Sequence, residues 1–379
     1  MGFVDPRPAL TNCSLDEVEA LLESLGLERW RARPILQWIY RRRAATFEAM
    51  TDLSKEAREL LAGKFRIFGS HVRDRHVSPD RTEKLLVALG DGNLIETVLI
   101  REGDRKTVCV STQVGCPVKC VFCASGLEGL VRNLTAGEIV EQVVFAANLL
   151  EPEERIDSLV IMGIGEPLLN YANLVRALRT WKAPWGMGIG YNRVTLSTVG
   201  ILDKLPKLVE DGVAPNLALS LHAPNDRIRL EVVPTMKRKI AELVKAGVEY
   251  RTATGKNVTF EYVLIDGVND DKKHALELGK KLRGTRCKVN VIPFNRVEET
   301  PYKSPSPTRV DRFVEALGSC GVPVMVRKRK GDAISAACGQ LRAAAERPVS
   351  SETAVLVHGE PIPIPREALP DPPAPDETP

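Results

Sequence analysis

Four of the eight cysteines lie within fifteen residues, in the segment CVSTQVGCPVKCVFC from Cys109 to Cys123. Cys116, Cys120 and Cys123 have the spacing C-x3-C-x2-C. Thiolates bind soft metals and iron–sulfur clusters, and a tight loop can bring closely spaced cysteines onto one cluster. Three cysteines would leave one iron of a [4Fe–4S] cluster without a protein ligand, which is an open position for chemistry. The alternative is a structural zinc site with Cys109 as fourth ligand, although zinc usually takes two well-separated C-x2-4-C pairs.

Polar residues and glycines follow several apolar segments between residues 106 and 345. The apolar segments alternate with stretches of helical character, which predicts a parallel sheet with outer helices, either doubly wound or curled into a partial barrel. Functional residues of such folds collect at the carboxyl ends of the strands. The segments expected at those ends are 163–167, 197–198, 220–222 and 293–295, which include Gly165, Glu166, Ser197, Ser220, Leu221, His222 and Asn295.

Residues 1–68 are expected to form a small helical module. Ser14 and Glu17 form a capping box, and the apolar residues that follow recur at helical spacing. Arg41-Arg42-Arg43 and nearby arginines are interleaved with Trp30 and other aromatic residues, which is compatible with an RNA-contacting face or with a solvated helix face over core aromatics.

Residues 69–105 are expected to form a β-rich linker. Its two apolar runs are separated by Gly90-Asp91-Gly92, a hairpin signal. Glu96 lies inside the second run, and the alternating pattern by itself places a carboxylate there on the exposed face.

The last part of the chain combines a basic run, a cysteine and a proline-rich tail. Residues 327–330 read RKRK and precede an alanine-rich segment that holds Cys338. Such a run beside an active-site rim is a possible phosphate contact. The expected division is an α/β core with its C-terminal segment over 106–345 and a disordered, proline-rich tail over 346–379.

Composition and charge set the broad class. The chain is 44% hydrophobic and 27% charged, with a net charge of +4, which is compatible with nucleic acid without requiring it. No apolar run is long enough to cross a membrane, and the first residues, MGFVDPRPAL, lack an apolar signal core. The cysteine pattern does not match a secreted disulfide scaffold, so the cytoplasm is the expected location.

Several motifs together resemble one family, the RlmN/Cfr radical S-adenosylmethionine (SAM) methyltransferases, over roughly residues 12–345. The matching stretches are CVSTQVGCPVKCVFC, MGIGEPLLN, RVTLSTVG, SLHAPND, NVIPFN and RKRKGDAISAACGQL. The resemblance implies an incomplete α/β barrel that carries a [4Fe–4S] cluster, preceded by a small helical domain and a short β segment.

The resemblance also implies a role for each matching residue. Cys116, Cys120 and Cys123 would hold the cluster, and the seven strand-end residues named above would contact SAM. Cys338 would be methylated during the reaction, Cys109 would later pair with it, and Glu96 would accept a proton.

The implied reaction is methylation of adenine carbon 2 in 23S rRNA, near the peptidyl-transferase centre, and in tRNA, just 3′ of the anticodon. Two SAM molecules would be used per turnover, one to methylate Cys338 and one to generate a radical on that methyl group. Glu96 would remove the ring proton, and attack by Cys109 on Cys338 would release the product as a transient disulfide forms. The implied partners are an electron donor for the cluster and a thiol reductant for the disulfide, and a monomer is expected.

Three alternatives stay open at this level. The motifs are shared with enzymes that methylate adenine carbon 8, so they do not separate the two positions. The second alternative is a non-catalytic, metal-bound RNA-binding protein with Cys109 as a zinc ligand. This alternative does not explain the presence of Cys338. The third alternative is a radical SAM enzyme with another substrate. It is disfavoured because such enzymes lack the combination of Cys109, Cys338 and Glu96.

Overall fold

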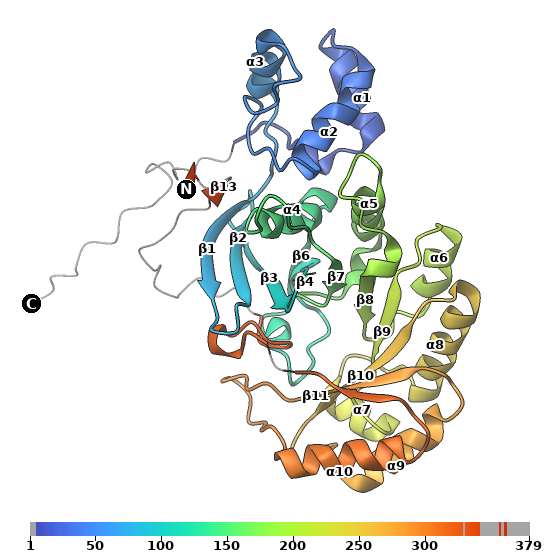
Figure 1. Ribbon diagram of the computed structural model, residues 1–379. Coiled ribbons are helices and arrows are strands. Elements are labelled where there is room, and N and C mark those ends of the chain that lie inside the picture. The colour runs from blue at the N-terminus through green and yellow to red at the C-terminus, as the bar shows by residue number, and fades with distance from the viewer. Residues whose placement is uncertain (1–4, 329, 342–355, 358–359, 362–379) are drawn as a thin grey trace, which may run out of the picture.

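The computed structural model describes residues 5–328, 330–341, 356–357 and 360–361 (Figure 1). A helical module lies at one end, and a single large sheet with helices on its outer side forms the rest. The predicted disordered tail, 346–379, lies outside the described residues apart from two short strands, β13 (Leu356–Val357) and β14 (Glu360–Pro361), which pair with each other. In the described part of the chain, no helix has the length and apolar character that crossing a bilayer requires.

The N-terminal module contains three helices, α1 (Leu15–Ser24), α2 (Ala32–Tyr40) and α3 (Lys55–Lys64). The predicted capping box is confirmed, because the Glu17 amide donates to Ser14 Oγ and the Ser14 amide donates to the Glu17 carboxylate. The apolar faces of the helices meet in a core that shields them from water. Its fully buried residues include Leu22, Ile35, Leu36, Ile39 and Leu61.

Two arginines of the predicted RNA-contacting face attach this module to the sheet domain. Arg43 donates to the carbonyl oxygens of Leu150 (3.1 Å) and Glu154 (2.6 Å), and Arg41 Nε donates to Gly186 O (3.0 Å). Arg42 instead stacks over the Trp38 ring at 4.2 Å within the module. RNA contact therefore stays a prediction for the side chains at the surface, such as the 63% exposed Trp30, whereas Arg41 and Arg43 have a structural task.

Loss of Arg43 should weaken this attachment measurably. We expect Arg43→Met to lower the free energy of unfolding by about 1–3 kcal/mol, because two partly buried carbonyl oxygens lose their donor. Arg42→Met, which removes an exposed stacking contact, should cost less than about 1 kcal/mol. Urea unfolding of both variants tests this, and equal effects at the two positions would contradict it.

The sheet has ten strands in the order β1-β2-β3-β4-β7-β8-β9-β10-β11-β12, with its two ends unpaired to each other among the described residues. From β4 to β12 all neighbours are parallel, whereas β1 to β3 are antiparallel additions at the β4 edge. The strands are β1 (His71–Val77), β2 (Glu83–Ala88), β3 (Leu94–Glu102), β4 (Arg105–Cys109), β7 (Ser158–Ile161), β8 (Val194–Thr198), β9 (Asn216–Ser220), β10 (Val258–Leu264), β11 (Lys288–Pro293) and β12 (Val324–Val326). The predicted partial barrel is confirmed, and the segment predicted as a linker continues its sheet.

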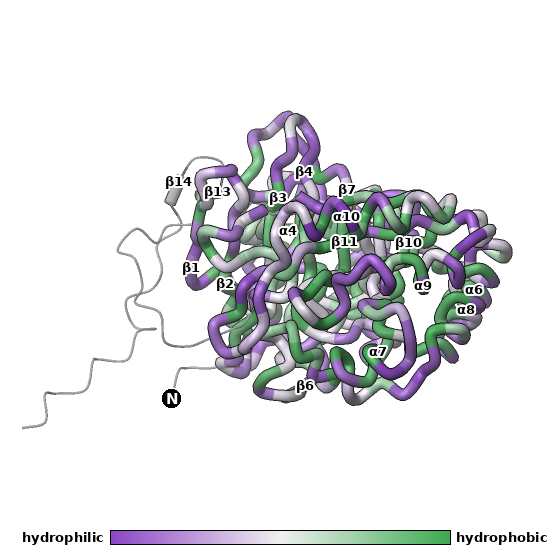
Figure 2. Tube along the Cα trace, turned by 90° about the horizontal axis from the view of Figure 1, so that it is seen from below, coloured by the Kyte–Doolittle hydropathy of each residue, from purple (hydrophilic) through white to green (hydrophobic). Residues whose placement is uncertain are grey.

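Helices cover the outer side of the parallel part of the sheet (Figure 1). They are α4 (Ala136–Ala147), α5 (Tyr171–Lys182), α6 (Lys204–Glu210), α7 (Asp226–Val232), α8 (Ile240–Thr254), α9 (Lys272–Leu282) and α10 (Pro307–Gly318). Thr135 and Glu138 form a second capping box at the start of α4. Figure 2 shows hydrophobic segments gathered in the interior and hydrophilic segments along the outer loops. One continuous apolar core therefore joins the helices to the sheet and leaves the inner face of the sheet for a site.

The strands β2, β3 and β4 have two different faces. Leu85, Val87, Ile95, Leu99 and Val108 belong to the main core on the helix side. Alternate residues point the other way, and there Val98 and Cys109 form a second, smaller apolar cluster with Ala336 and Leu341 from the end of the described chain. This second face is where the segment around Cys338 is held.

Candidate active site

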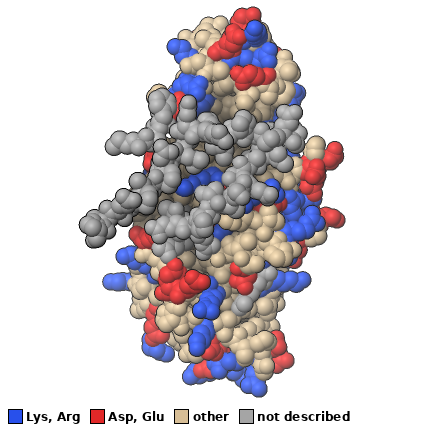
Figure 3. All heavy atoms as spheres, turned by 90° about the vertical axis from the view of Figure 1, so that its left-hand side faces the viewer, with Lys and Arg blue, Asp and Glu red and all other residues tan. Residues whose placement is uncertain are grey.

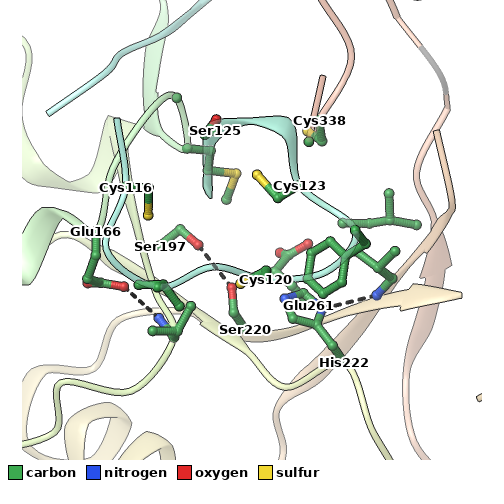
Figure 4. Close-up of a pocket in the computed structure, with 18 of the residues that line it drawn as sticks. Cys116, Cys120, Cys123, Ser125, Glu166, Ser197, Ser220, His222, Glu261 and Cys338 are labelled. Atoms are coloured by element: carbon green, nitrogen blue, oxygen red, sulfur yellow. Dashed lines mark hydrogen bonds between the residues drawn. The ribbon is translucent and has the colours of Figure 1, made fainter. Parts of the chain in front are cut away.

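A pocket opens on the inner side of the sheet, at the carboxyl ends of the parallel strands. Its volume is about 910 Å³ when the open mouth is counted. Residues from the cysteine loop, from the ends of β7 to β11 and from the segment around Cys338 line it. Figure 4 shows the sulfur atoms of Cys116, Cys123 and Cys338 turned toward the same space.

The cysteine triplet lies on a loop after β5 (Gln113–Gly115), a short strand paired with β6 (Leu130–Asn133). The Cys116 amide donates to Gly129 O (2.8 Å), and the Val121 amide donates to Val232 O (3.1 Å). Gly115 has φ +71°, and a Cβ there would lie 1.9 Å from Gly129 O, so only glycine fits at this position. The loop is therefore held from two sides, with its three thiols at the pocket wall.

The environment of the three thiols suits a positively charged metal cluster. Burial raises the pKa of the Cys116 thiol to about 12 and raises the pKa of the Cys120 and Cys123 thiols, and each is raised further by neighbouring thiolates. Three thiolates brought together without water repel one another, and iron supplies the charge that compensates them. The donor set and its place in the pocket thus fit the predicted [4Fe–4S] cluster.

Removal of one of these thiols should abolish cluster binding. We expect Cys120→Ala to retain little iron after anaerobic reconstitution, because two cysteines cannot hold the cluster in the place of three. Iron and sulfide analysis together with the visible absorption spectrum measure this. Cys320→Ala, which removes a half-buried thiol beyond α10, is the matched control and should bind iron normally. An intact cluster in Cys120→Ala would contradict the assignment.

Cys109 lies apart from the triplet. It belongs to β4, where it is opposite Val98 of β3 and Val160 of β7, and it packs against the segment that carries Cys338. The thiol of Cys109 is buried, and burial raises its pKa to about 12, with the negative charge of Cys338 adding to the effect. Cys109 is outside the pocket that the triplet lines, which favours a three-cysteine cluster over a zinc site that includes Cys109.

Glu166 follows β7 and braces the rim of the pocket. Its carboxylate accepts hydrogen bonds from the amides of Leu168 (3.1 Å) and Val199 (2.9 Å), so it links the loops after β7 and β8. Burial raises the pKa of Glu166 to about 7, against these hydrogen bonds, which lower it. The preceding Gly165 has φ +111°, and a Cβ there would lie 2.7 Å from the side chain of Gln113.

Ser197 and Ser220 lie at the carboxyl ends of β8 and β9, and His222 follows β9. The hydroxyls of Ser197 and Ser220 lie 3.5 Å apart at the pocket wall (Figure 4). His222 Nδ1 accepts a hydrogen bond from the Val263 amide (3.1 Å), and burial lowers the pKa of His222 to about 3. The imidazole is therefore neutral and carries its proton on Nε2. Leu221 is fully buried and lies outside the pocket lining, so any part that it takes in binding falls to its backbone.

Asn295 lies at the end of β11 and has an unmet hydrogen-bonding group. Its Nδ2 donates to Cys338 O (3.0 Å), while its Oδ1 is buried without a partner among the described residues. A buried amide oxygen at a pocket wall favours a ligand that donates a hydrogen bond to it. An amino or hydroxyl group of a bound nucleoside meets this need.

Cys338 lies on a segment, residues 331–341, that we call the catalytic loop. The loop is tied to the cysteine triplet by two bonds, from the Ala124 amide to Gly339 O (2.7 Å) and from Ser125 Oγ to Leu341 O (2.7 Å). On the opposite side the Gly331 amide donates to Asp80 Oδ2 (3.1 Å) in the turn between β1 and β2. Cys338 is thereby held at the pocket wall, half-buried.

Glu96 is buried, so the prediction of an exposed carboxylate from the strand pattern is wrong. Only 4% of its surface is exposed, because the catalytic loop covers this face of β3. Glu96 is two residues from Val98, which is opposite Cys109, and therefore lies diagonally from Cys109 on the same face, at a distance of about 7 Å between backbones. Glu96 and Cys109 are outside the pocket lining and form a layer beneath Cys338.

Two charged residues of the site, Arg229 and Glu261, were not expected from the sequence, and a third, Arg327, was expected in another role. Arg229 of α7 is fully buried and donates to the carbonyl oxygens of Ser220 (2.8 Å), Leu221 and Val199, so it holds two strand ends together. Glu261 of β10 and Arg327 after β12 line the pocket itself. Arg327 was placed by its run of basic residues among phosphate contacts, but the structure turns it inward, beside Met162 (3.5 Å). An alternating strand pattern marks Glu261 only as an interior residue, and no local signal marks Arg229.

Comparisons with known proteins agree with this architecture. The model of the radical SAM superfamily matches residues 110–279, and that of the ribosomal RNA large subunit methyltransferase N-terminal domain matches residues 9–67. The probable dual-specificity RNA methyltransferase RlmN of Rhodopirellula baltica is 46% identical over 334 residues, which cover 88% of this chain and 90% of that protein. Its counterpart from Symbiobacterium thermophilum is 45% identical over 345 residues, which cover 90% and 93%.

A solved structure is similar over nearly the same length. The crystal structure of a radical SAM methyltransferase from Sphaerobacter thermophilus superimposes with a TM-score of 0.86 at 45% identity, and the match covers 89% of this chain and 100% of that one. The chain therefore belongs to the RlmN family of RNA methyltransferases within the radical SAM superfamily, whose members use a [4Fe–4S] cluster and SAM.

Proposed function

We propose that this enzyme methylates carbon 2 of adenine in two substrates, 23S rRNA near the peptidyl-transferase centre and tRNA just 3′ of the anticodon, through a methylated Cys338. The observation that carries the proposal is the position of Cys338 between the pocket and Cys109. Its segment packs on Cys109, and its side chain lines the pocket with the cysteine triplet. The relatives named dual-specificity RNA methyltransferases support the choice of two RNA substrates.

The pocket residues bind SAM in this proposal. Glu166, Ser197, Ser220, His222 and Asn295 surround the space in front of the triplet, and Gly165 and Leu221 contribute backbone. Asn295 Oδ1 and the serine hydroxyls offer acceptors for amino and hydroxyl groups. The cluster and SAM together supply a radical, which is the chemistry that activates an S-methyl group.

Cys338 carries the methyl group from SAM to RNA. Its thiolate first accepts a methyl group by displacement, which is ordinary nucleophilic chemistry. Carbon 2 of adenine is electron-poor and is not a nucleophile, so it cannot attack the methyl group of SAM directly. The sulfur therefore acts as the carrier, and the base becomes attached to Cys338 through the transferred carbon.

Glu96 and Cys109 release the product. Glu96 accepts the proton that leaves carbon 2, and the Cys109 thiolate attacks the sulfur of Cys338 to form a disulfide. The sulfur–carbon bonding pair leaves with the transferred carbon, which takes up a proton to become the methyl group of the product. Both residues lie on the sheet face under the catalytic loop, so neither blocks the path of the base into the pocket. A second SAM per turnover, an electron donor, a thiol reductant, a monomeric state and a cytoplasmic location belong to the same proposal.

RNA reaches the pocket with its target base unstacked, because a paired base cannot approach Cys338. The surface available for this contact carries both basic and acidic side chains. Figure 3 shows lysine and arginine side chains interspersed with acidic ones on the visible parts of one face. The N-terminal module, with the exposed Trp30 beside Arg31 at 4.9 Å, is the proposed RNA-contacting domain.

Nucleoside mass analysis tests the proposal. The protein is reconstituted anaerobically and given SAM, a reductant and unmodified rRNA or tRNA. 2-Methyladenosine in both RNA pools is the expected result. 8-Methyladenosine would contradict the position on the base, product in one pool would contradict dual specificity, and a colourless, iron-free protein would favour a non-catalytic RNA-binding protein.

A further inference from the structure

A buried ion pair joins β2 to β3 directly beneath the catalytic loop. Lys84 Nζ lies 2.7 Å from Glu96 Oε1, and the side chains of both residues are 5% exposed. The same Nζ lies 3.5 Å from Ser335 O in the catalytic loop. Removing an ammonium and a carboxylate from water is costly, and an apolar pair of similar size often serves stability as well or better. The charges at this place therefore call for an explanation other than stability.

The register of the strands places this pair beside Cys109. Lys84 is opposite Val98 across β2 and β3, and Val98 is opposite Cys109 across β3 and β4. Directly opposed residues share a face of a sheet, so the three side chains form one row. Glu96 is two residues from Val98 and points to the same face. The ion pair thus lies in the layer that holds Cys109 under Cys338.

The β1–β2 region also holds the catalytic loop at its other end. The Gly331 amide donates to Asp80 Oδ2 (3.1 Å). Gly331 packs so closely that a Cβ there would lie 2.9 Å from Thr82 Cγ2 and 2.8 Å from Ala336 Cβ. The ammonium of Lys84 contacts both Glu96 and the catalytic loop at Ser335. Lys84 therefore helps to fix the position of the loop relative to Glu96.

We propose that Lys84 is a positioning residue for proton transfer, holding the Glu96 carboxylate charged and in one orientation against the loop that carries Cys338. The inference rests on the proposed function, in which Glu96 is the base. In that step the proton leaves carbon 2 of the attached adenine, the C–H bonding pair stays in the ring, and the carboxylate becomes a carboxylic acid. Lys84 makes and breaks no covalent bond.

The order of the steps separates this role from simple support of the fold. Methylation of Cys338 and attachment of RNA precede proton removal, so neither step needs Glu96. A defect at Lys84 that acts through Glu96 should therefore leave methylation of Cys338 intact and stop the reaction with RNA attached to the protein. A loosened catalytic loop would instead slow methylation of Cys338 as well.

The experiment uses the full-length, reconstituted enzyme with tRNA and compares Lys84→Met, Lys84→Arg and a control. The control is Lys106→Met, which breaks another 2.7 Å ion pair of the same sheet, between Lys106 and Glu154, at the start of β4. Product is measured by nucleoside mass analysis, methyl-Cys338 by peptide mass, and attached RNA by denaturing gel. We expect Lys84→Met to lose about 10- to 100-fold in product formation, the loss that corresponds to one hydrogen bond to a charged group, with normal methyl-Cys338 and accumulated adduct. Lys84→Arg should recover most of the activity, and Lys106→Met should match the unaltered enzyme.

Two parallel variants make the result decisive. Glu96→Gln should accumulate the same adduct, and the double variant, Lys84→Met with Glu96→Gln, should be no slower than Glu96→Gln alone. The double variant has no buried unpaired charge from this pair, so it also serves if Lys84→Met fails to fold. Thermal unfolding and iron content are recorded for every variant.

The outcomes assign any failure to its source. Slow methylation of Cys338 in Lys84→Met, a loss of product without adduct, or an added loss in the double variant would each overturn the inference and leave Lys84 a structural residue. Normal turnover by Glu96→Gln would show that Glu96 is not the base, and the proposed role of Lys84 would then be wrong as well. Absence of 2-methyladenosine from the unaltered enzyme would instead contradict the proposed function.

Discussion

Replacement of Cys338 by alanine should abolish RNA methylation, with a loss of at least about 10⁴-fold in product formation. Cys338 lines the pocket and carries the methyl group in the proposed mechanism, and no other thiol in the described part of the chain lines the pocket apart from the triplet. The cluster should be unaffected, because the loop of Cys116, Cys120 and Cys123 keeps its own backbone hydrogen bonds. Nucleoside mass analysis measures product, and iron content with the visible spectrum measures the cluster.

Cys13→Ala is the matched control for this experiment. Cys13 is also half-buried, but it lies in the N-terminal module, where its thiol faces Ala9 O at 3.8 Å. Normal activity is expected for this variant. Detectable 2-methyladenosine from Cys338→Ala would mean that the methyl group reaches RNA without passing through this sulfur.

Replacement of Cys109 by alanine should stop the reaction after RNA has become attached. Cys109 lies in the layer below Cys338. Among the described residues it is the one cysteine of the small apolar cluster that includes Ala336 and Leu341 of the catalytic loop. Without its thiolate nothing attacks the sulfur of Cys338, so the bond from sulfur to the transferred carbon persists. We expect a band of protein joined to RNA on a denaturing gel, with methyladenosine reduced by at least about 100-fold.

Cys287→Ala controls for the loss of a buried thiol at the sheet. Cys287 is 2% exposed and directly precedes β11, so its burial matches that of Cys109. This variant should release product and show no adduct. Adduct-free turnover by Cys109→Ala would show that another group resolves the intermediate and would remove the proposed disulfide.

Local signals were enough for much of the fold. Capping at Ser14 and at Thr135 depends on side chains within three residues of each other, so the sequence shows it directly. The strands β7 to β12 follow from short apolar runs between helices, and their polar ends predicted the rim with Glu166, His222 and Asn295. The cysteine triplet is local as well, because its spacing alone brings three thiols to one loop.

Other features needed contacts between distant segments. The burial of Glu96 depends on the catalytic loop, which lies far along the chain and covers one face of β3. An alternating pattern describes which residues share a face of a strand, but it cannot say whether that face will be covered. The same limit hid the attachment role of Arg43, whose carbonyl partners come from the loop after α4.

The sequence by itself thus determined most of the elements, the cysteine loop and, through resemblance, the family. Only the tertiary structure decided which charges are inside. Lys84, Arg229 and Arg327 look like solvated basic residues when they are read in order along the chain, yet each of them is turned inward to carbonyl oxygens, a carboxylate or the pocket. The physical reason is that the cost of burying a charge is offset by partners from other strands and loops, and such partners are chosen by the fold and not by the neighbouring residues.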